Sequence, residues 1–417
     1  MLLQNDILKT ATCSINTLRK RNKDTIKHRI NYIIALLNSE LCQKNGKIPL
    51  SPCIDFDSSH DECESKQHKS INTTYDTRIL LNKQHLDFHD VISSLGGKLS
   101  YVKSGATGHT FKGTINIQNN IYNYAVKVCA YPKKEKYGKT HDIRRPENAE
   151  LHMLRVLSHF VTTQQTPHLV LPIIYFDTDI GPFLFLHKNN IVPADNKKYQ
   201  EFVEKYKNGE YDNQVSVLIC EWANNGDLLD YLRQKYKTLG LLEWKCIFFQ
   251  ILSTLAVIQS KYPSFRHNDL KANNILIHKI ESEKTSFNYF VENIKFKIPN
   301  IGFQLKICDY DFACIPNVVE NNKVDADWTT NINVNPEQNR YYDVHFFFNT
   351  LIRKGFLPDL LEIVPIQVRE FIDRILPVKL RCNTKYVHKR GRLLSKVEFI
   401  TPLQIIMTDP FFADFKQ

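Results

Sequence analysis

The polar part of residues 266–277 carries side chains suited to group transfer. Asp269 and Asn274 stand five positions apart with Lys271 between them, directly before the apolar run 275–277, which the pattern predicts to be a buried strand. On a loop held against that strand, a carboxylate could orient a hydroxyl and accept its proton, and an amide oxygen could hold a metal ion. A lysine between them could neutralise charge on a moving phosphoryl group. The alternative is an Asn-rich surface turn, because Asp and Asn are common turn residues.

The spacing H-x-D-x-K-x-x-N, which begins at His267, resembles the catalytic loop of the eukaryotic protein-kinase superfamily. The resemblance implies a role for each of these residues. Asp269 would be the base that orients the acceptor hydroxyl, Lys271 would contact the γ-phosphate, and Asn274 would be a Mg²⁺ ligand.

A second group of residues, farther upstream, is suited to nucleotide phosphates. Gly105 and Gly108 lie in a predicted turn between two strands, and a later strand contains Lys127 in the sequence YAVKV. Glycine lets the backbone approach phosphates closely, although a glycine pair alone more often marks a plain hairpin. The order resembles the kinase glycine-rich loop and V-A-I-K strand, and this resemblance assigns the three residues to ATP binding. One departure is Lys103, which stands where the first glycine of G-x-G-x-x-G is expected.

Residues 144–159 have the apolar spacing of a helix. Glu150 of this helix is predicted to pair with Lys127 and to orient it toward phosphate. Glu147, three positions earlier, is the competing candidate, and either carboxylate could instead be solvated.

Residues 220–227, with the sequence CEWANNGD, end one predicted strand and open a predicted helix over 228–236. The segment resembles the hinge between the two lobes of a kinase. The resemblance implies that Glu221 to Ala223 offer backbone groups to adenine, that Cys220 lies behind it at the gatekeeper position, and that Asp227 reaches the ribose. Asp227 could equally be only a helix N-cap.

Asp309 ends a further predicted strand, in the sequence FQLKICDYDFA. A carboxylate in that place suits Mg²⁺, which binds carboxylate oxygens together with phosphates and water. Asp309 matches the aspartate of the kinase D-F-G motif. Asp311 replaces the glycine of that motif, which puts in doubt the flip between active and inactive loop states seen in many kinases.

The residues that follow resemble the activation segment and the start of a large-lobe helix. Asp343 resembles the aspartate that braces the catalytic loop, and Glu337 resembles the glutamate of A-P-E. Asn268 stands where many kinases carry an arginine that pairs with a phosphate on the activation segment. Thr329 and Thr330 are the acceptors that the sequence offers there, but without the arginine we expect activity without their phosphorylation.

Composition limits the class of protein. The 417 residues are 42% hydrophobic, enough for one large two-lobed domain with appendages. The formal charge of +11 favours acidic partners such as nucleotides, acidic peptides, nucleic acid or anionic lipid. Ten cysteines without a C-x-x-C pair indicate a reducing compartment. We expect no secretory signal and no transmembrane segment, because no apolar run is long enough to span a bilayer.

The motifs together predict an α+β, bilobal protein-kinase-like fold with a small antiparallel-sheet lobe and a mainly helical large lobe. We place a partly helical, partly flexible appendage at 1–94, the small lobe at 95–222 and the large lobe at 223–417. Within the appendage, four residues offer ligands of the types that zinc accepts, but their spacing matches no familiar finger and favours a flexible linker: Cys53, His60, Cys63 and His68.

The function that the resemblance implies is ATP- and Mg²⁺-dependent phosphoryl transfer to serine and threonine hydroxyls of protein substrates. The His-Asn-Asp and Asp-Tyr-Asp forms resemble the divergent serine/threonine kinases of large cytoplasmic DNA viruses, including the poxvirus morphogenesis type. That placement implies the cytoplasm of an infected host cell, or the virion. One alternative is a small-molecule kinase of the choline or aminoglycoside type, which also carries an acidic residue two positions after the metal aspartate. A pseudokinase scaffold is the other alternative, motivated by Lys103, by the shortened segment before Asp343 and by a basic run.

This basic run covers residues 379–396 and contains no acidic residue. Such a run is most often a solvated face of the protein. It could also be a surface that contacts nucleic acid or an anionic membrane.

Overall fold

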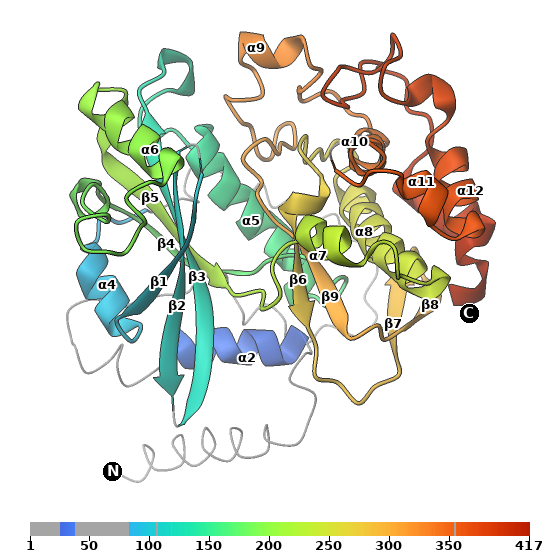
Figure 1. The fold of residues 1–417 in the computed structure, drawn as a ribbon, viewed down its shortest axis with the longest axis horizontal. Coiled ribbons are helices and arrows are strands. Elements are labelled where there is room, and N and C mark those ends of the chain that lie inside the picture. The colour runs from blue at the N-terminus through green and yellow to red at the C-terminus, as the bar shows by residue number, and fades with distance from the viewer. Residues whose placement is uncertain (1–25, 38–82, 106, 118, 354–355) are drawn as a thin grey trace, which may run out of the picture.

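The computed structural model describes residues 26–37, 83–105, 107–117, 119–353 and 356–417. The described chain has two lobes, with a twisted sheet in one and a group of helices in the other (Figure 1). The α+β, bilobal fold predicted from the sequence is therefore confirmed. The four candidate zinc ligands between residues 53 and 68 lie outside the described residues.

The small lobe is built on a five-stranded antiparallel sheet in the order β1-β2-β3-β5-β4. Its strands are β1 (Lys98–Ser104), β2 (Gly108–Ile117), β3 (Asn120–Pro132), β4 (Pro172–Asp179) and β5 (Tyr211–Glu221). Along β3, Tyr124, Val126 and Val128 are buried on one face. Because successive strand residues point to opposite faces, Lys127 projects from the other face. Helix α5 (Pro146–Thr162) packs against β4.

The large lobe is mainly helical and is organised around α8 (Leu241–Lys261). Its other helices are α7 (Leu228–Lys235), α9 (Asp327–Thr330), α10 (Tyr342–Leu351), α11 (Leu360–Ile363), α12 (Ile366–Ile375) and α13 (Pro402–Thr408). Every residue of α8 from Trp244 to Gln259 is buried. In the described part of the chain, α8 is the one helix that is long and apolar enough to cross a membrane. Its burial identifies it as the core helix that its apolar sequence predicts.

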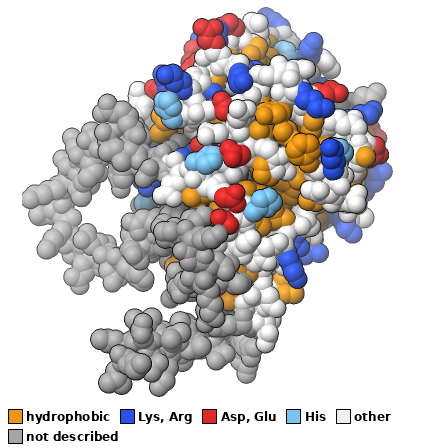
Figure 2. All heavy atoms as spheres, turned by 90° about the vertical axis from the view of Figure 1, so that its left-hand side faces the viewer, with side chains coloured by type: hydrophobic (Ala, Val, Ile, Leu, Met, Phe, Trp, Pro, Cys, Tyr) orange, Lys and Arg blue, Asp and Glu red, His pale blue; other side chains and the backbone are white. Residues whose placement is uncertain are grey.

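Two small antiparallel sheets complete the large lobe. Strand β6 (Ile275–Lys279) pairs with β9 (Phe303–Ile307), and the sequence between them forms a hairpin of β7 (Ser286–Val291) and β8 (Ile294–Pro299). A second insertion, between β4 and β5, contains α6 (Lys197–Lys207). On the face of the molecule shown in Figure 2, acidic, basic and hydrophobic side chains are interspersed.

Two helices from the predicted appendage pack on the lobes. Helix α4 (Phe88–Ser94) lies against the small lobe, where the Phe88 ring is 4.8 Å from the Phe183 ring. Helix α2 (Ile26–Leu37) runs along the base of the sheet toward the β6 end of the large lobe (Figure 1). Its residues Ile33 and Leu36 are fully buried. The described part of residues 1–94 is thus integrated into the fold.

Candidate active site

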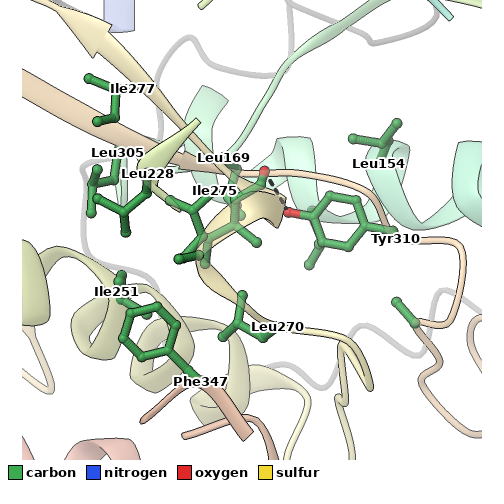
Figure 3. Close-up of a cluster of buried hydrophobic side chains, with 14 of the residues drawn as sticks. Leu154, Leu169, Leu228, Ile251, Leu270, Ile275, Ile277, Leu305, Tyr310 and Phe347 are labelled. Atoms are coloured by element: carbon green, nitrogen blue, oxygen red, sulfur yellow. Dashed lines mark hydrogen bonds between the residues drawn. The ribbon is translucent and has the colours of Figure 1, made fainter. Parts of the chain in front are cut away.

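The loop that contains Asp269 and Asn274 is fixed by a buried strand pair. In the β6–β9 register, Ile275 lies opposite Ile307. Because the pair is antiparallel, Asn274 before β6 and Asp309 after β9 emerge at the same end. The backbone N–H of Cys308 donates to Asn274 O at 3.0 Å, which holds Asp309 beside Asn274. Ile275 and Ile277 are fully buried in the hydrophobic cluster of Figure 3.

Two residues of the site have the left-handed backbone conformation, which is uncommon outside glycine. They are Asn268, with φ of 62°, and Asp309, with φ of 67°. Buried Asp343 at the start of α10 stabilises the first of these turns, because its carboxylate accepts from His267 N at 2.7 Å and Asn268 N at 2.9 Å. The predicted bracing role of Asp343 is therefore confirmed. Non-glycine residues in this conformation persist only where the surrounding structure determines it.

Asp269 is surrounded by hydrogen-bond donors. Its Oδ2 accepts from Asn274 Nδ2 at 3.1 Å and lies 2.8 Å from Lys271 Nζ. Its Oδ1 accepts from Arg392 Nη2 at 2.5 Å. Two donors therefore meet Oδ2 and one donor meets Oδ1, so a lone pair on Oδ1 remains for another hydroxyl.

Arg392 is a site residue that the sequence motifs do not indicate. It comes from the basic run 379–396 and is buried, with its guanidinium 4.4 Å from the ring centre of Phe346. Its second nitrogen donates to Asn268 O. The signal in the sequence is the basic run itself, which gives no indication of which of its cations turns inward.

Lys127 forms the centre of a charged cluster between the lobes. Its Nζ lies 2.7 Å from Glu150 Oε1 and 3.0 Å from Asp309 Oδ1. Glu147, the competing candidate, pairs instead with Arg145 at 3.0 Å. Burial alone would lower the pKa of the Lys127 amine, but the two carboxylates raise it well above its usual value. Lys127 in turn lowers the pKa of Asp309 to about 2, so both partners are charged at neutral pH.

The two glycines of the predicted phosphate loop have different physical roles. The N–H of Gly105 donates to Gly108 O at 2.8 Å and closes the turn between β1 and β2. A Cβ on Gly108 would lie 1.7 Å from Val128 O, so this position requires glycine for packing of β2 on β3. A Cβ on Gly105 would meet no heavy atom closer than 3.8 Å, so the outer side of the turn is open.

Within the hinge, Glu221 and Ala223 are buried and Asp227 caps a helix. The Glu221 carboxylate accepts from Arg29 Nε at 2.9 Å and from Lys306 Nζ at 3.0 Å, and its backbone N–H donates to Leu171 O at 3.1 Å. Asp227 caps α7 by accepting from Asp230 N at 3.0 Å. The N-cap interpretation of Asp227 is thus correct, and a ribose contact would be additional to it. Ala223, which lies between Glu221 and Asp227 in the sequence, is also buried.

The segment after Asp309 is tied to residues 266–268 by hydrogen bonds. The buried Arg266 donates to Asn335 Oδ1 at 2.6 Å and to Asn333 O at 2.7 Å. Asn268 Nδ2 donates to Phe312 O at 3.0 Å. The acceptors in these hydrogen bonds are uncharged amide and backbone oxygens, so the segment is held through neutral groups.

Thr329 was expected to be an available phosphate acceptor, and that expectation is wrong. Its side chain is fully buried and its hydroxyl donates to Val324 O at 2.8 Å. Thr330, the next residue, is exposed. Asp311, in the place of the D-F-G glycine, is paired with Lys323, which anchors this part of the segment.

A model of the family described as "Poxvirus serine/threonine protein kinase" matches residues 112–415. "Putative serine/threonine-protein kinase R400" of Acanthamoeba polyphaga mimivirus is 44% identical over 99% of this chain and 86% of its own. "Putative serine/threonine-protein kinase R301" of the same virus is 27% identical over 68% of this chain and 79% of its own. "Serine/threonine-protein kinase 2" of fowlpox virus is 27% identical over 48% of this chain and 43% of its own.

Proposed function

Because this chain belongs to the poxvirus serine/threonine protein kinase family, we propose that it transfers the γ-phosphoryl group of ATP to serine and threonine hydroxyls of proteins. The observation that carries this proposal is the convergence of two groups of residues. Asp269, Lys271 and Asn274 share one loop, and Asp309 beside them pairs with Lys127 of the other lobe. Phosphoryl transfer depends mainly on positioning and charge stabilisation, which this arrangement supplies.

Asp269 is the proposed base. A serine or threonine hydroxyl that donates to Oδ1 is oriented toward the γ-phosphorus, and its proton passes to the carboxylate as the new O–P bond forms. The bond from the γ-phosphorus to the leaving ADP oxygen breaks in the same displacement. Lys271, 2.8 Å from Asp269 Oδ2, neutralises charge on the transferred group.

Lys127 and the glycine turn are the proposed phosphate contacts. Glu150 orients the charged Lys127 amine, and the open outer side of Gly105 allows close approach of a phosphate to the backbone. The backbone from Glu221 to Ala223 is the proposed adenine contact.

Asn274 and Asp309 fit a Mg²⁺ site. Asn274 directs its Nδ2 to Asp269 O at 3.0 Å, which leaves its Oδ1 for another partner. An amide oxygen and a carboxylate are ligand types that Mg²⁺ accepts. In the part of the chain that the structure describes, no group of three or more His, Cys, Asp or Glu side chains could hold a metal ion. The phosphates and water would therefore supply the remaining ligands, and bound Mg²⁺ would neutralise phosphate charge.

The test is a transfer assay with labelled ATP and Mg²⁺ in which the full chain is offered a dephosphorylated acidic protein, choline and an aminoglycoside. We expect label on the protein, and phosphoamino-acid analysis should find it on serine and threonine. Label only on choline or the aminoglycoside would replace the proposal with a small-molecule kinase. Absence of label on every acceptor would indicate a scaffold that does not transfer phosphate.

A further inference from the structure

Residues 386–394, here called the basic hairpin, fold back on themselves within the basic run. Val387 and Leu393 form a β-bridge, and the N–H of Leu394 donates to Tyr386 O at 2.8 Å. The turn at the tip contains Gly391, whose φ of 89° suits glycine. Lys389 and Arg390 of this turn are exposed, whereas residues 391–393 are buried.

The inner side of the basic hairpin is fastened to the active site. Arg392 donates to Asp269 Oδ1 at 2.5 Å. Asn349 of α10 donates to Gly391 O at 3.3 Å, and Asn333 donates to Leu393 O at 2.8 Å. These contacts come from the catalytic loop, a core helix and the segment after Asp309, so the hairpin holds a fixed position relative to the proposed base.

The tip of the basic hairpin carries two cations that have no acidic partner among the described residues. Lys389 and Arg390 are exposed. No carboxylate in the described residues lies within ion-pair distance of either side chain, whereas Lys396 of the same run pairs with Glu337 at 2.6 Å. Burial lowers the pKa of His388, and the charges of Lys389, Arg390, Arg392 and Arg353 lower it further. Among the described residues, the positive charge here is therefore not paired with acidic side chains, unlike the mixed face in Figure 2.

The tip lies within reach of a peptide that presents its hydroxyl to Asp269. Arg390 is two residues and Lys389 three residues from Arg392, and an extended chain of that length spans at most about 7 to 11 Å. An extended peptide advances about 3.3 Å per residue. The cations can therefore meet side chains about two to three positions from the acceptor residue.

We propose that the basic hairpin docks the acceptor segment of a protein substrate and selects segments with acidic side chains beside the acceptor hydroxyl. This proposal rests on the proposed protein-kinase function and names its substrate class. An acidic peptide is favoured over nucleic acid or an anionic membrane, because Arg392 fixes the hairpin at the residue that the acceptor must reach. Charge complementarity at such a surface gives specificity and faster association.

The experiment compares three peptides with one central serine and acidic, neutral or basic flanks, using the full chain. The charge-reversal variant is Lys389→Glu/Arg390→Glu. The matched control, Lys284→Glu/Lys297→Glu, changes the same charge at two exposed lysines near the β7–β8 hairpin, away from residues 379–396 in Figure 1. We expect the wild-type protein and the control to favour the acidic peptide by about tenfold in kcat/KM, and charge reversal to abolish that preference.

A binding measurement separates this proposal from the proposed function. Fluorescence anisotropy measures binding of the acidic peptide, with alanine in place of serine, at low and high salt. Binding of a single-stranded oligonucleotide and of anionic vesicles is measured for comparison. We expect salt-sensitive peptide binding that charge reversal removes, even if no peptide is phosphorylated. Equal kcat/KM for the three peptides would overturn the proposal. So would a control variant that loses the preference for the acidic peptide as fully as the charge-reversal variant does. Charge reversal that weakens only oligonucleotide or vesicle binding would also overturn it.

Discussion

Arg29 Nε donates to Glu221 Oε2 at 2.9 Å, and this buried contact joins α2 to the last residue of β5. Lys306 of β9 reaches the same carboxylate oxygen at 3.0 Å. Glu221, at the end of β5 in the small lobe, thus connects α2 with β9 of the large lobe. Burial would raise the pKa of this carboxyl, but Arg29 and Lys306 together lower it to about 2.

Replacement of Arg29 by alanine should destabilise the protein by about 3 kcal/mol, because it leaves a buried carboxylate with one cation and removes donors from Pro167 O and Leu169 O. Thermal unfolding of Arg29→Ala checks this prediction. The control is Lys198→Ala, which breaks an exposed ion pair with Glu201 and should cost little stability. Equal melting temperatures for the two variants would show that the α2 contact contributes nothing to stability.

Stability should fall as the pH drops below 6.5. Burial lowers the pKa of His168 to about 3 and of His345 to about 4, and His109, His152 and His278 are shifted in the same direction. At these five histidines the unfolded chain therefore binds more protons than the folded chain between about pH 4 and 6.5. Each such histidine reduces the free energy of unfolding by up to about 1.4 kcal/mol per pH unit.

Urea unfolding at pH 7.5 and pH 5.5 measures this dependence. The variant His168→Gln should be less stable at both pH values, because His168 bonds Leu305 O and Tyr289 Oη, but its stability should change less between them. A wild-type free energy of unfolding that is the same at both pH values would refute the prediction.

Lys127→Met and Asp309→Asn should each reduce phosphoryl transfer by about 100-fold or more, since each removes a charge from the proposed nucleotide site. Both variants should remain folded by circular dichroism. Lys134→Met, at an exposed lysine of the same lobe, is the matched control and should retain activity. Full activity in either site variant would remove that residue from the proposed site.

Activity should not require phosphorylation of the segment between Asp311 and Asp343. Arg266 and Asn268 already hold this segment through neutral acceptors, and Thr329 is buried. Phosphatase treatment of the purified protein and the variant Thr330→Ala should each leave most activity. Loss of most activity in both experiments would show that a phosphate and another basic residue order the segment.

The parts of the site that the sequence predicts well are those fixed by local spacing. The apolar run 275–277 must be buried, which determines where Asp269 and Asn274 emerge, and the alternation of β3 separates Lys127 from the core. The choice between Glu147 and Glu150 needed the structure. Glu147 pairs with Arg145, two positions away, whereas Glu150 pairs with Lys127 of β3.

Contacts between distant parts of the chain have no periodic pattern and could not be predicted. Arg392 and Asp269 are 123 positions apart, and Arg29 and Glu221 are 192 positions apart. Composition shows that residues 379–396 are basic, but only the tertiary packing on α10 turns Arg392 inward and leaves Lys389 outside. The burial of Thr329 likewise depends on tertiary structure, because its hydroxyl turns back to donate to Val324 O.

The most direct test of the account is the rate of phosphoryl transfer to protein by Asp269→Asn, measured together with nucleotide binding. The control is Asp195→Asn, at an exposed aspartate of the small lobe. Loss of the proposed base should reduce the rate by about 100-fold or more while ATP still binds, and the control should match the wild-type protein. A transfer rate in folded Asp269→Asn equal to that of the wild-type protein would contradict the account.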